Sequence, residues 1–283
     1  MATPESPYGP SNAENVAGSK PVRLPHLLAA KGKGTKLTMI TAYDGLTAAI
    51  FDQAGMDMIL VGDSIGNVML GHGSTLPVSL DEMVVATRGV ASAVERAFVI
   101  ADLPFGTYEA SPEQALASAV RLVKAGANAV KLEGGRPRAD AIRALTDAGI
   151  PVMGHLGFTP QSVNALGGFR VQGRGEEEGE KLLADALAIE EAGAMGMVLE
   201  MVPEPVAARV TEALAVPTIG IGAGAHCDGQ VLVWSDMAGM TEWRPRFAKQ
   251  FGRVGDALRQ AALEYAAAVR EGSFPAPEHT FDG

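Results

Sequence analysis

The stretch Met58-Ile59-Leu60-Val61-Gly62-Asp63-Ser64 is an apolar run that ends in an acid and a hydroxyl. Three later stretches repeat this design: Phe98-Val99-Ile100-Ala101-Asp102, Ala129-Val130-Lys131-Leu132-Glu133 and Met197-Val198-Leu199-Glu200. A short apolar run with Val and Ile is typical of a strand buried on both faces, as in a parallel sheet covered by helices. The carboxyl ends of parallel strands share one edge, so we expect four acids to converge there.

Convergent carboxylates repel one another and are costly to desolvate, so we expect a cation or a proton among them. Either Asp63 or Asp102 alone could simply cap the helix that follows its strand. Together with Glu133, however, they favour a hard divalent cation such as Mg²⁺, which prefers carboxylate, water and substrate oxygens. No His and Cys residues occur at zinc spacing in the sequence, which makes zinc the weaker alternative.

Strands and helices alternate along the rest of the chain. Predicted helices close in Ala-Gly, as at Ala54-Gly55, and begin with recognisable signals such as Ser79 with Glu82 or Ser111 before Pro112. The predicted strands are Leu37 to Thr41, Met58 to Gly62, Ala97 to Asp102, Ala129 to Glu133, Pro151 to His155, Gly196 to Glu200, Pro217 to Gly220 and Gln230 to Val233. This alternation favours a closed (β/α)8 TIM barrel over an open doubly wound sheet, which remains the alternative.

The predicted organisation is one barrel domain with an N-terminal extension and C-terminal helices. Residues 1–20, rich in Pro, Ser, Gly and Asn, are expected to form a disordered leader. The catalytic barrel then covers 21–272, with a helical pattern over 246–270, and 273–283 forms a tail.

Composition narrows the class of protein. The 283 residues carry a net charge of −10, which argues against nucleic-acid binding and against attraction to an anionic membrane surface. The only cysteine, Cys227, cannot form an internal disulfide, and no apolar run reaches the length of a membrane span. We therefore expect a cytoplasmic enzyme that acts on small molecules.

Lys131 and His155 are candidate substrate contacts. Lys131 lies two residues before Glu133, so both side chains point to the same face of a strand. A buried lysine there would neutralise carboxylates or bind an anionic substrate group; a Schiff base is disfavoured because nearby acids keep the amine protonated. His155 ends the predicted fifth strand, where substrate binding or orientation is expected in preference to metal ligation.

Glu200 and the glycine-rich segment at 220–224 complete the candidates. Apolar neighbours on both sides of Glu200 would keep its carboxylate poorly solvated and therefore basic, which suits a general base. The alternative is a cap for a helix predicted over 206–214. The segment Gly220-Ile221-Gly222-Ala223-Gly224 is either a phosphate-binding loop or merely a tight turn.

Seven stretches of the chain, read together, resemble the ketopantoate hydroxymethyltransferase family. They are Val61-Gly62-Asp63-Ser64, Gly71-His72-Gly73-Ser74-Thr75-Leu76-Pro77, Ala101-Asp102-Leu103-Pro104-Phe105, Val130-Lys131-Leu132-Glu133-Gly134-Gly135, Gly154-His155-Leu156-Gly157-Phe158-Thr159-Pro160-Gln161-Ser162-Val163-Asn164, Val171-Gln172-Gly173-Arg174-Gly175 and Gly220-Ile221-Gly222-Ala223-Gly224. The resemblance covers roughly Leu37 to Phe281.

The resemblance implies a (β/α)8 barrel enzyme of pantothenate biosynthesis with one Mg²⁺ per subunit, commonly assembled as a homo-oligomer, a decamer. Such enzymes transfer a hydroxymethyl group from the co-substrate 5,10-methylenetetrahydrofolate to 3-methyl-2-oxobutanoate, giving 2-dehydropantoate through a Mg-stabilised enolate. By similarity, the metal ligands are Asp63, Asp102 and Glu133. By similarity also, the oxoacid contacts are Asp63, Ser64, Asp102 and Lys131, with His155 close by, and Glu200 is the base.

Two other functions remain open from the sequence. A Mg-dependent 2-oxoacid aldolase or lyase without folate would need the same metal chelate and the same base. A non-catalytic barrel could bind a phosphorylated ligand through 220–224, although phosphate binding alone does not require four acids at one edge.

Overall fold

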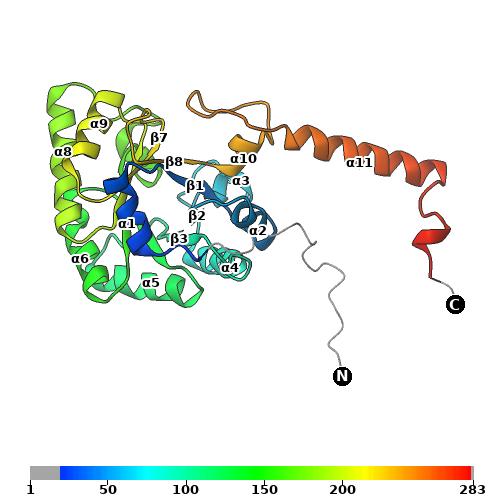
Figure 1. Cartoon of the computed structure of the whole chain (residues 1–283), viewed down its shortest axis with the longest axis horizontal. Helices are drawn as coiled ribbons and strands as arrows, with labels where there is room; N and C mark the ends of the chain where they lie inside the picture. Colours follow the sequence, from blue (N-terminus) through cyan, green and yellow to red (C-terminus); the bar gives the residue numbers. More distant parts are fainter. Residues whose placement is uncertain (1–19, 282–283) are drawn as a thin grey trace. The chain divides into compact units, whose positions relative to one another are not determined.

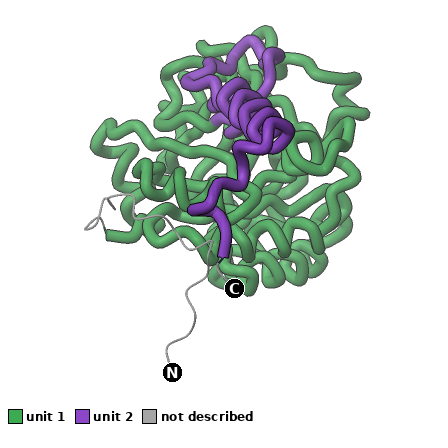
Figure 2. The backbone as a smooth tube through the Cα atoms, turned by 90° about the vertical axis from the view of Figure 1, so that its right-hand side faces the viewer, with its two compact units in different colours: residues 1–231 green, residues 232–283 purple. Residues whose placement is uncertain are grey.

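The computed structural model describes residues 20–281, so the predicted leader at 1–20 lies, apart from Lys20, outside the described residues. The chain divides into two compact units between Val231 and Leu232 (Figure 2). All of the candidate site residues belong to the first unit.

Eight parallel strands close into a barrel in the order β1 to β8, which confirms the (β/α)8 prediction (Figure 1). Their bounds are β1 (Leu37–Thr41), β2 (Met58–Val61), β3 (Phe98–Asp102), β4 (Ala129–Glu133), β5 (Val152–Gly157), β6 (Gly196–Glu200), β7 (Thr218–Ile221) and β8 (Gly229–Leu232). Every residue of β2, β3 and β4 is buried, as the continuous apolar runs indicated.

Helices α4, α5, α6, α8 and α9 surround the strands (Figure 1). The helices of the first unit are α1 (Leu24–Lys33), α2 (Gly45–Gln53), α3 (Ile65–Val68), α4 (Leu80–Ala91), α5 (Pro112–Lys124), η1 (Arg136–Arg138), α6 (Ala139–Asp147), η2 (Pro160–Ser162), α7 (Val163–Leu166), α8 (Glu176–Glu191) and α9 (Glu204–Ala213). The second unit contains α10 (Trp234–Ala238), α11 (Val254–Glu271) and η3 (Pro277–His279).

The predicted helix starts are confirmed where the signal is local. Ser79 Oγ accepts a hydrogen bond from the Glu82 amide at 3.3 Å, and the Glu82 carboxylate accepts one from the Ser79 amide at 2.7 Å. Ser111 accepts from the Gln114 amide at 3.2 Å ahead of α5. The helix predicted over 246–270 was wrong at its start, because α11 begins only at Val254, after Gly252, a residue with poor helix propensity.

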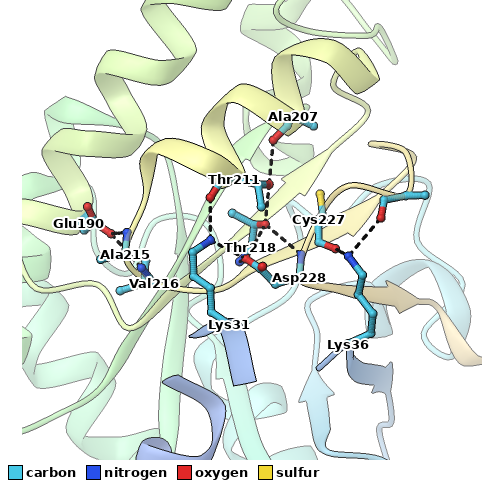
Figure 3. A network of polar contacts seen from close by, with 11 residues as sticks. Lys31, Lys36, Glu190, Ala207, Thr211, Ala215, Val216, Thr218, Cys227 and Asp228 are labelled. Carbon is cyan, nitrogen blue, oxygen red and sulfur yellow. Dashed lines mark hydrogen bonds and ion pairs between the residues drawn. The ribbon is translucent and has the colours of Figure 1, made fainter. Parts of the chain in front are cut away.

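A polar network fastens α1 to the start of β7 (Figure 3). Lys31 Nζ donates to Asp228 Oδ2 at 2.9 Å and to the Thr211 carbonyl at 2.6 Å, while Asp228 Oδ2 also accepts from the Thr218 amide at 2.9 Å. Because Thr218 is the first residue of β7, this network lies at the amino end of the strand. It stabilises the barrel at the end opposite to the one where the predicted site residues gather.

Strand register sets the neighbours at the carboxyl ends. Asp102 of β3 pairs with Lys131 of β4, Glu133 pairs with His155 of β5, and Gly157 of β5 pairs with Glu200 of β6. Side chains that are far apart in the sequence thus become lateral neighbours on one edge of the barrel.

Candidate active site

The three proposed metal ligands are buried together at the carboxyl ends of neighbouring strands. Asp63, Asp102 and Glu133 are 4%, 2% and 4% exposed. Asp102 Oδ2 accepts from the Asp63 amide at 3.0 Å. Neither aspartate caps the helix after its strand, since α3 begins after Ser64 and α5 is capped by Ser111. Three of the four acids predicted to converge therefore lie together here.

Electrostatics within this cluster follow from burial. Burial, reinforced by the carboxylates of Asp102 and Glu133, raises the pKa of Asp63 to about 8. Burial also raises the pKa of Asp102, although the neighbouring Lys131 opposes that shift. Without a bound cation the cluster thus retains a proton near neutral pH, which is the alternative to a cation that the sequence indicated.

Lys131 supplies a buried positive charge. Its Nζ lies 2.8 Å from Asp102 Oδ1, and both side chains are almost wholly enclosed. Burial alone would lower the pKa of Lys131, but Asp102, Glu133 and Asp63 outweigh it and hold that pKa above its ordinary value. The amine is therefore a cation and not a nucleophile, which agrees with the expectation that Lys131 does not form a Schiff base.

His155 links the acid cluster to Glu200. Its Nδ1 lies 3.2 Å from Glu133 Oε1, and its Nε2 lies 3.3 Å from Glu200 Oε2. Burial and Lys131 favour the neutral ring, yet the carboxylates of Glu133 and Glu200 prevail and raise the pKa of His155 to about 9. An imidazolium there attracts both carboxylates, although its Nε2 makes no well-aligned hydrogen bond to Glu200.

Glu200 stands apart from the other acids. Its sequence neighbours are apolar, but the barrel places the His155 ring beside its carboxylate, a contact that the sequence did not reveal. Glu200 is not the cap of the next helix, because α9 begins at Glu204 after Pro203. Met201, directly after it, has a φ of +48°, a strained value for a residue with a side chain. Such strain at the end of β6 fits a backbone that is held to direct one side chain.

Ser64 is held by Tyr43, a residue that no sequence pattern had singled out. Ser64 Oγ and Tyr43 OH lie 2.8 Å apart, and Tyr43 is 3% exposed. Burial raises the pKa of the Tyr43 phenol well above its ordinary value. Gly62 is required beside this pair, because a Cβ there would lie 2.8 Å from Ser64 Oγ. The oxoacid contact expected at Ser64 is thus oriented from the loop after β1.

Gln161 is a second supporting residue that was not among the predicted site residues. Its Nε2 donates to Asp63 Oδ2 at 2.8 Å, and its amide donates to Glu133 Oε2 at 3.0 Å. Its Oε1 accepts from Tyr108 OH at 2.5 Å. The only signal in the sequence is a polar residue shortly after β5. Gln161 determines which oxygen of each carboxylate remains available to another partner.

The donor set fits Mg²⁺. Within residues 20–281 no three His, Cys, Asp or Glu side chains form a ready metal cage. Mg²⁺ does not need one, because it binds through one or two carboxylates and completes its shell with water and substrate oxygens. Asp102 Oδ1 is buried without a well-aligned hydrogen bond, despite the nearby Lys131 ammonium. Such an oxygen, beside Asp63, is a suitable hard ligand.

The glycine-rich segment after β7 has the geometry of a tight turn. Gly222 and Gly224 have φ values of +64° and +81°, and a Cβ at Gly224 would lie 2.5 Å from the Glu204 side chain. Glu204 Oε1 accepts from the Ala225 amide at 3.2 Å, so a carboxylate already occupies a donor that a phosphate would use. The turn interpretation is favoured over phosphate binding.

A closed barrel with buried acids, a lysine and a histidine at the carboxyl ends of its strands defines a (β/α)8 enzyme. The family model of ketopantoate hydroxymethyltransferase matches residues 21–277. The chain belongs to this family and is an enzyme, a hydroxymethyltransferase of pantothenate biosynthesis. No helix in the described part of the chain is long and apolar enough to cross a membrane.

Curated relatives agree over nearly the whole length. The 3-methyl-2-oxobutanoate hydroxymethyltransferase of Rhodococcus jostii (strain RHA1) is 56% identical over 97% of this chain and 95% of its own. The enzyme of the same name from Leifsonia xyli subsp. xyli (strain CTCB07) is also 56% identical, over 97% of this chain and 100% of its own.

Solved structures show the same fold at low identity. Phosphonopyruvate hydrolase in complex with oxalate and Mg²⁺ gives a TM-score of 0.60 at 16% identity, covering 90% of this chain and 92% of that one. A 2,3-dimethylmalate lyase of the PEP mutase/isocitrate lyase superfamily gives 0.56 at 17%, with coverage of 90% and 92%. At this identity the likeness concerns the fold alone.

Proposed function

We propose that the chain transfers a hydroxymethyl group from 5,10-methylenetetrahydrofolate to 3-methyl-2-oxobutanoate, giving 2-dehydropantoate. The observation that carries the proposal is the group of side chains in which the buried Asp102–Lys131 pair lies beside Asp63, with the His155–Glu200 pair adjoining it. It brings together oxygen ligands for a divalent cation, a fixed positive charge and a carboxylate held apart from the other acids.

The oxoacid binds, in this proposal, against Asp63, Ser64, Asp102, Lys131 and His155. Asp63, Asp102 and Glu133 hold one Mg²⁺ per subunit, and their hard oxygens suit that ion. When bound, Mg²⁺ acts as a Lewis acid toward the carboxylate and keto oxygens of the oxoacid.

Glu200 is the general base in this scheme. It takes the proton from C3 of the oxoacid, while His155, 3.3 Å from its carboxylate, keeps it pointed at the substrate. Lys131 places a positive charge beside the enolate oxygen that develops as the proton leaves. C3 then bonds to the donor methylene, both bonds from that methylene to the folate nitrogens N5 and N10 break, and water supplies the hydroxyl group. The proton taken from C3 and the remaining proton of the water go to the two nitrogens, which leaves tetrahydrofolate.

Exchange of the C3 hydrogen tests the role of Glu200 without the folate. Incubated with Mg²⁺ and 3-methyl-2-oxobutanoate in D₂O, Glu200→Gln should lose exchange at C3 by NMR while still binding the oxoacid by calorimetry. Glu212→Gln, on the exposed face of α9, is the matched control and should exchange like the parent protein. Full exchange in Glu200→Gln would remove the residue from the role of base.

A Mg-dependent aldolase or lyase on the same site is separated from this function by product analysis with and without 5,10-methylenetetrahydrofolate. We further propose a cytoplasmic homo-oligomer, a decamer by resemblance, built from a catalytic domain over 21–272 and a tail over 273–283. Light scattering on the purified full chain measures the subunit number.

A further inference from the structure

A cavity of about 180 Å³ adjoins the acid cluster and takes no part in the steps above. Its walls come from three loops, those after β3, β4 and β5. The residues that matter for its chemistry are Phe105, Tyr108, Glu133, Arg138, Gln161 and Ser162. Apart from Tyr108 and Arg138, they fall in stretches that carry the family resemblance, yet only Glu133 has a role in the proposed reaction.

One side of the cavity, called its floor here, is formed by residues that also belong to the proposed reaction site. Glu133 and Gln161 line it, and Gln161 Nε2 also holds the Asp63 carboxylate at 2.8 Å. Tyr108 also lines the cavity and donates its hydroxyl to Gln161 Oε1 at 2.5 Å. A molecule in the cavity therefore reaches the cluster where the oxoacid reacts.

The walls present flat groups. Phe105 is 49% exposed and lines the cavity, so part of its ring is open to a ligand. The guanidinium of Arg138 lies over the Tyr108 ring, 5.8 Å from its centroid, and its Nη1 donates to the Glu109 carbonyl at 3.2 Å. An aromatic face and a guanidinium plane both stack on flat heteroaromatic rings.

The backbone is shaped to keep Arg138 in this place. Gly134 has a φ of +115°, which allows the chain to turn sharply from β4 into η1. A Cβ at Gly134 would lie 3.0 Å from Arg138 Cγ, so only glycine leaves the arginine stem undisturbed. The wall is thus built by the turn after β4 and not by a freely moving surface side chain.

The volume of the cavity and the polar groups that line it limit which molecules can bind there. The cavity is smaller than the roughly 300 Å³ of sites that enclose a drug-sized ligand. It encloses one ring system, and a longer molecule must extend past Phe105. Its floor carries a carboxylate and an amide, so a ring with hydrogen-bonding edges suits it better than a purely apolar ring.

We propose that this cavity binds the reduced pterin ring of the one-carbon donor, with the ring stacked between Phe105 and Arg138 and its methylene turned toward the oxoacid. This inference rests on the proposed function, in which the donor is a reduced folate. The polar edge of the pterin meets Glu133, Gln161 and Ser162, and the remainder of the folate leaves through the open side.

Phe105→Ala tests the proposal, with Phe281→Ala, a fully exposed phenylalanine near the C-terminus, as the matched control. We expect Phe105→Ala to raise the KM for 5,10-methylenetetrahydrofolate about tenfold while the KM for 3-methyl-2-oxobutanoate stays within about twofold. Phe105→Tyr, which keeps the ring, should restore the donor KM. Calorimetry with tetrahydrofolate should show the same tenfold loss.

Exchange of the C3 hydrogen in D₂O without folate separates this inference from the proposed function. An unchanged donor KM in a Phe105→Ala protein that still exchanges would overturn the pterin site. Absence of exchange in the parent protein would instead overturn the proposed function. If Phe105→Ala loses exchange, Arg138→Met is measured in its place. An unchanged KM for 5,10-methylenetetrahydrofolate in Arg138→Met would also overturn the pterin site.

Discussion

The Lys131–Asp102 pair offers the sharpest test of the electrostatics of the cluster. The two side chains are 4% and 3% exposed, and their charged atoms lie 2.8 Å apart. At an effective dielectric constant of about 20, two unit charges at this distance attract by about 6 kcal/mol. Desolvation offsets much of that attraction, but removing one partner of a buried pair still costs about 3–5 kcal/mol.

Lys131→Met keeps the length of the side chain and removes its charge. We expect the metal-free variant to lose about 3–5 kcal/mol of unfolding free energy, because Asp102, Asp63 and Glu133 are left facing one another. Lys181→Met is the control: its ammonium also lies near a carboxylate, 3.1 Å from Asp185, but the side chain is 79% exposed. That change should cost about 0.5 kcal/mol or less.

The measurement is urea unfolding in the presence of a chelator, at one fixed protein concentration so that assembly does not shift the result. Asp102→Asn and the double variant complete a cycle. We expect a coupling of about 2–3 kcal/mol between the two positions, since the double variant contains neither an unpaired lysine nor an unpaired aspartate. Additive losses, or a Lys131→Met protein as stable as Lys181→Met, would refute a buried ion pair at this site.

Two further changes test residues that support the site. Gln161→Met, which keeps the volume but removes the donor to Asp63 Oδ2, should weaken Mg²⁺ binding about 10- to 100-fold in a calorimetric titration with Mg²⁺ alone, and an unchanged affinity would contradict a positioning role. Asp52 accepts from the amides of Glu95 and Ala97, at 2.9 and 2.6 Å, ahead of β3. Asp52→Ala should therefore cost about 2–4 kcal/mol of unfolding free energy while leaving C3 exchange intact, and a protein of parental stability would show these bonds to be dispensable.

The strands and their acid ends could be predicted because their signal is local. A run such as Phe98 to Asp102 carries its burial, its type and its end within five residues. The capping box at Ser79 and Glu82 is equally local. Parallel pairing in sequence order then brings the acids together with no further information.

The supporting residues could not be predicted for the opposite reason. Gln161 meets Asp63 across 98 positions of sequence, and Tyr43 meets Ser64 across 21. Neither contact follows from periodicity or composition, since it depends on how two loops fold over one barrel edge. The same holds for His155 and Glu200, whose contact depends on the register between β5 and β6.

The charge balance of the cluster explains why its members occur together. Asp63, Asp102, Glu133 and Glu200 bring four negative charges when ionised, whereas Lys131 and His155, whose pKa values are both raised, bring two positive ones. Two negative charges remain, and three of the four acids are buried, where uncompensated charge is costly. A proton on Asp63 removes one of them, in keeping with the pKa of about 8 that burial gives this residue. A divalent cation neutralises both remaining negative charges, so every carboxylate can then stay ionised.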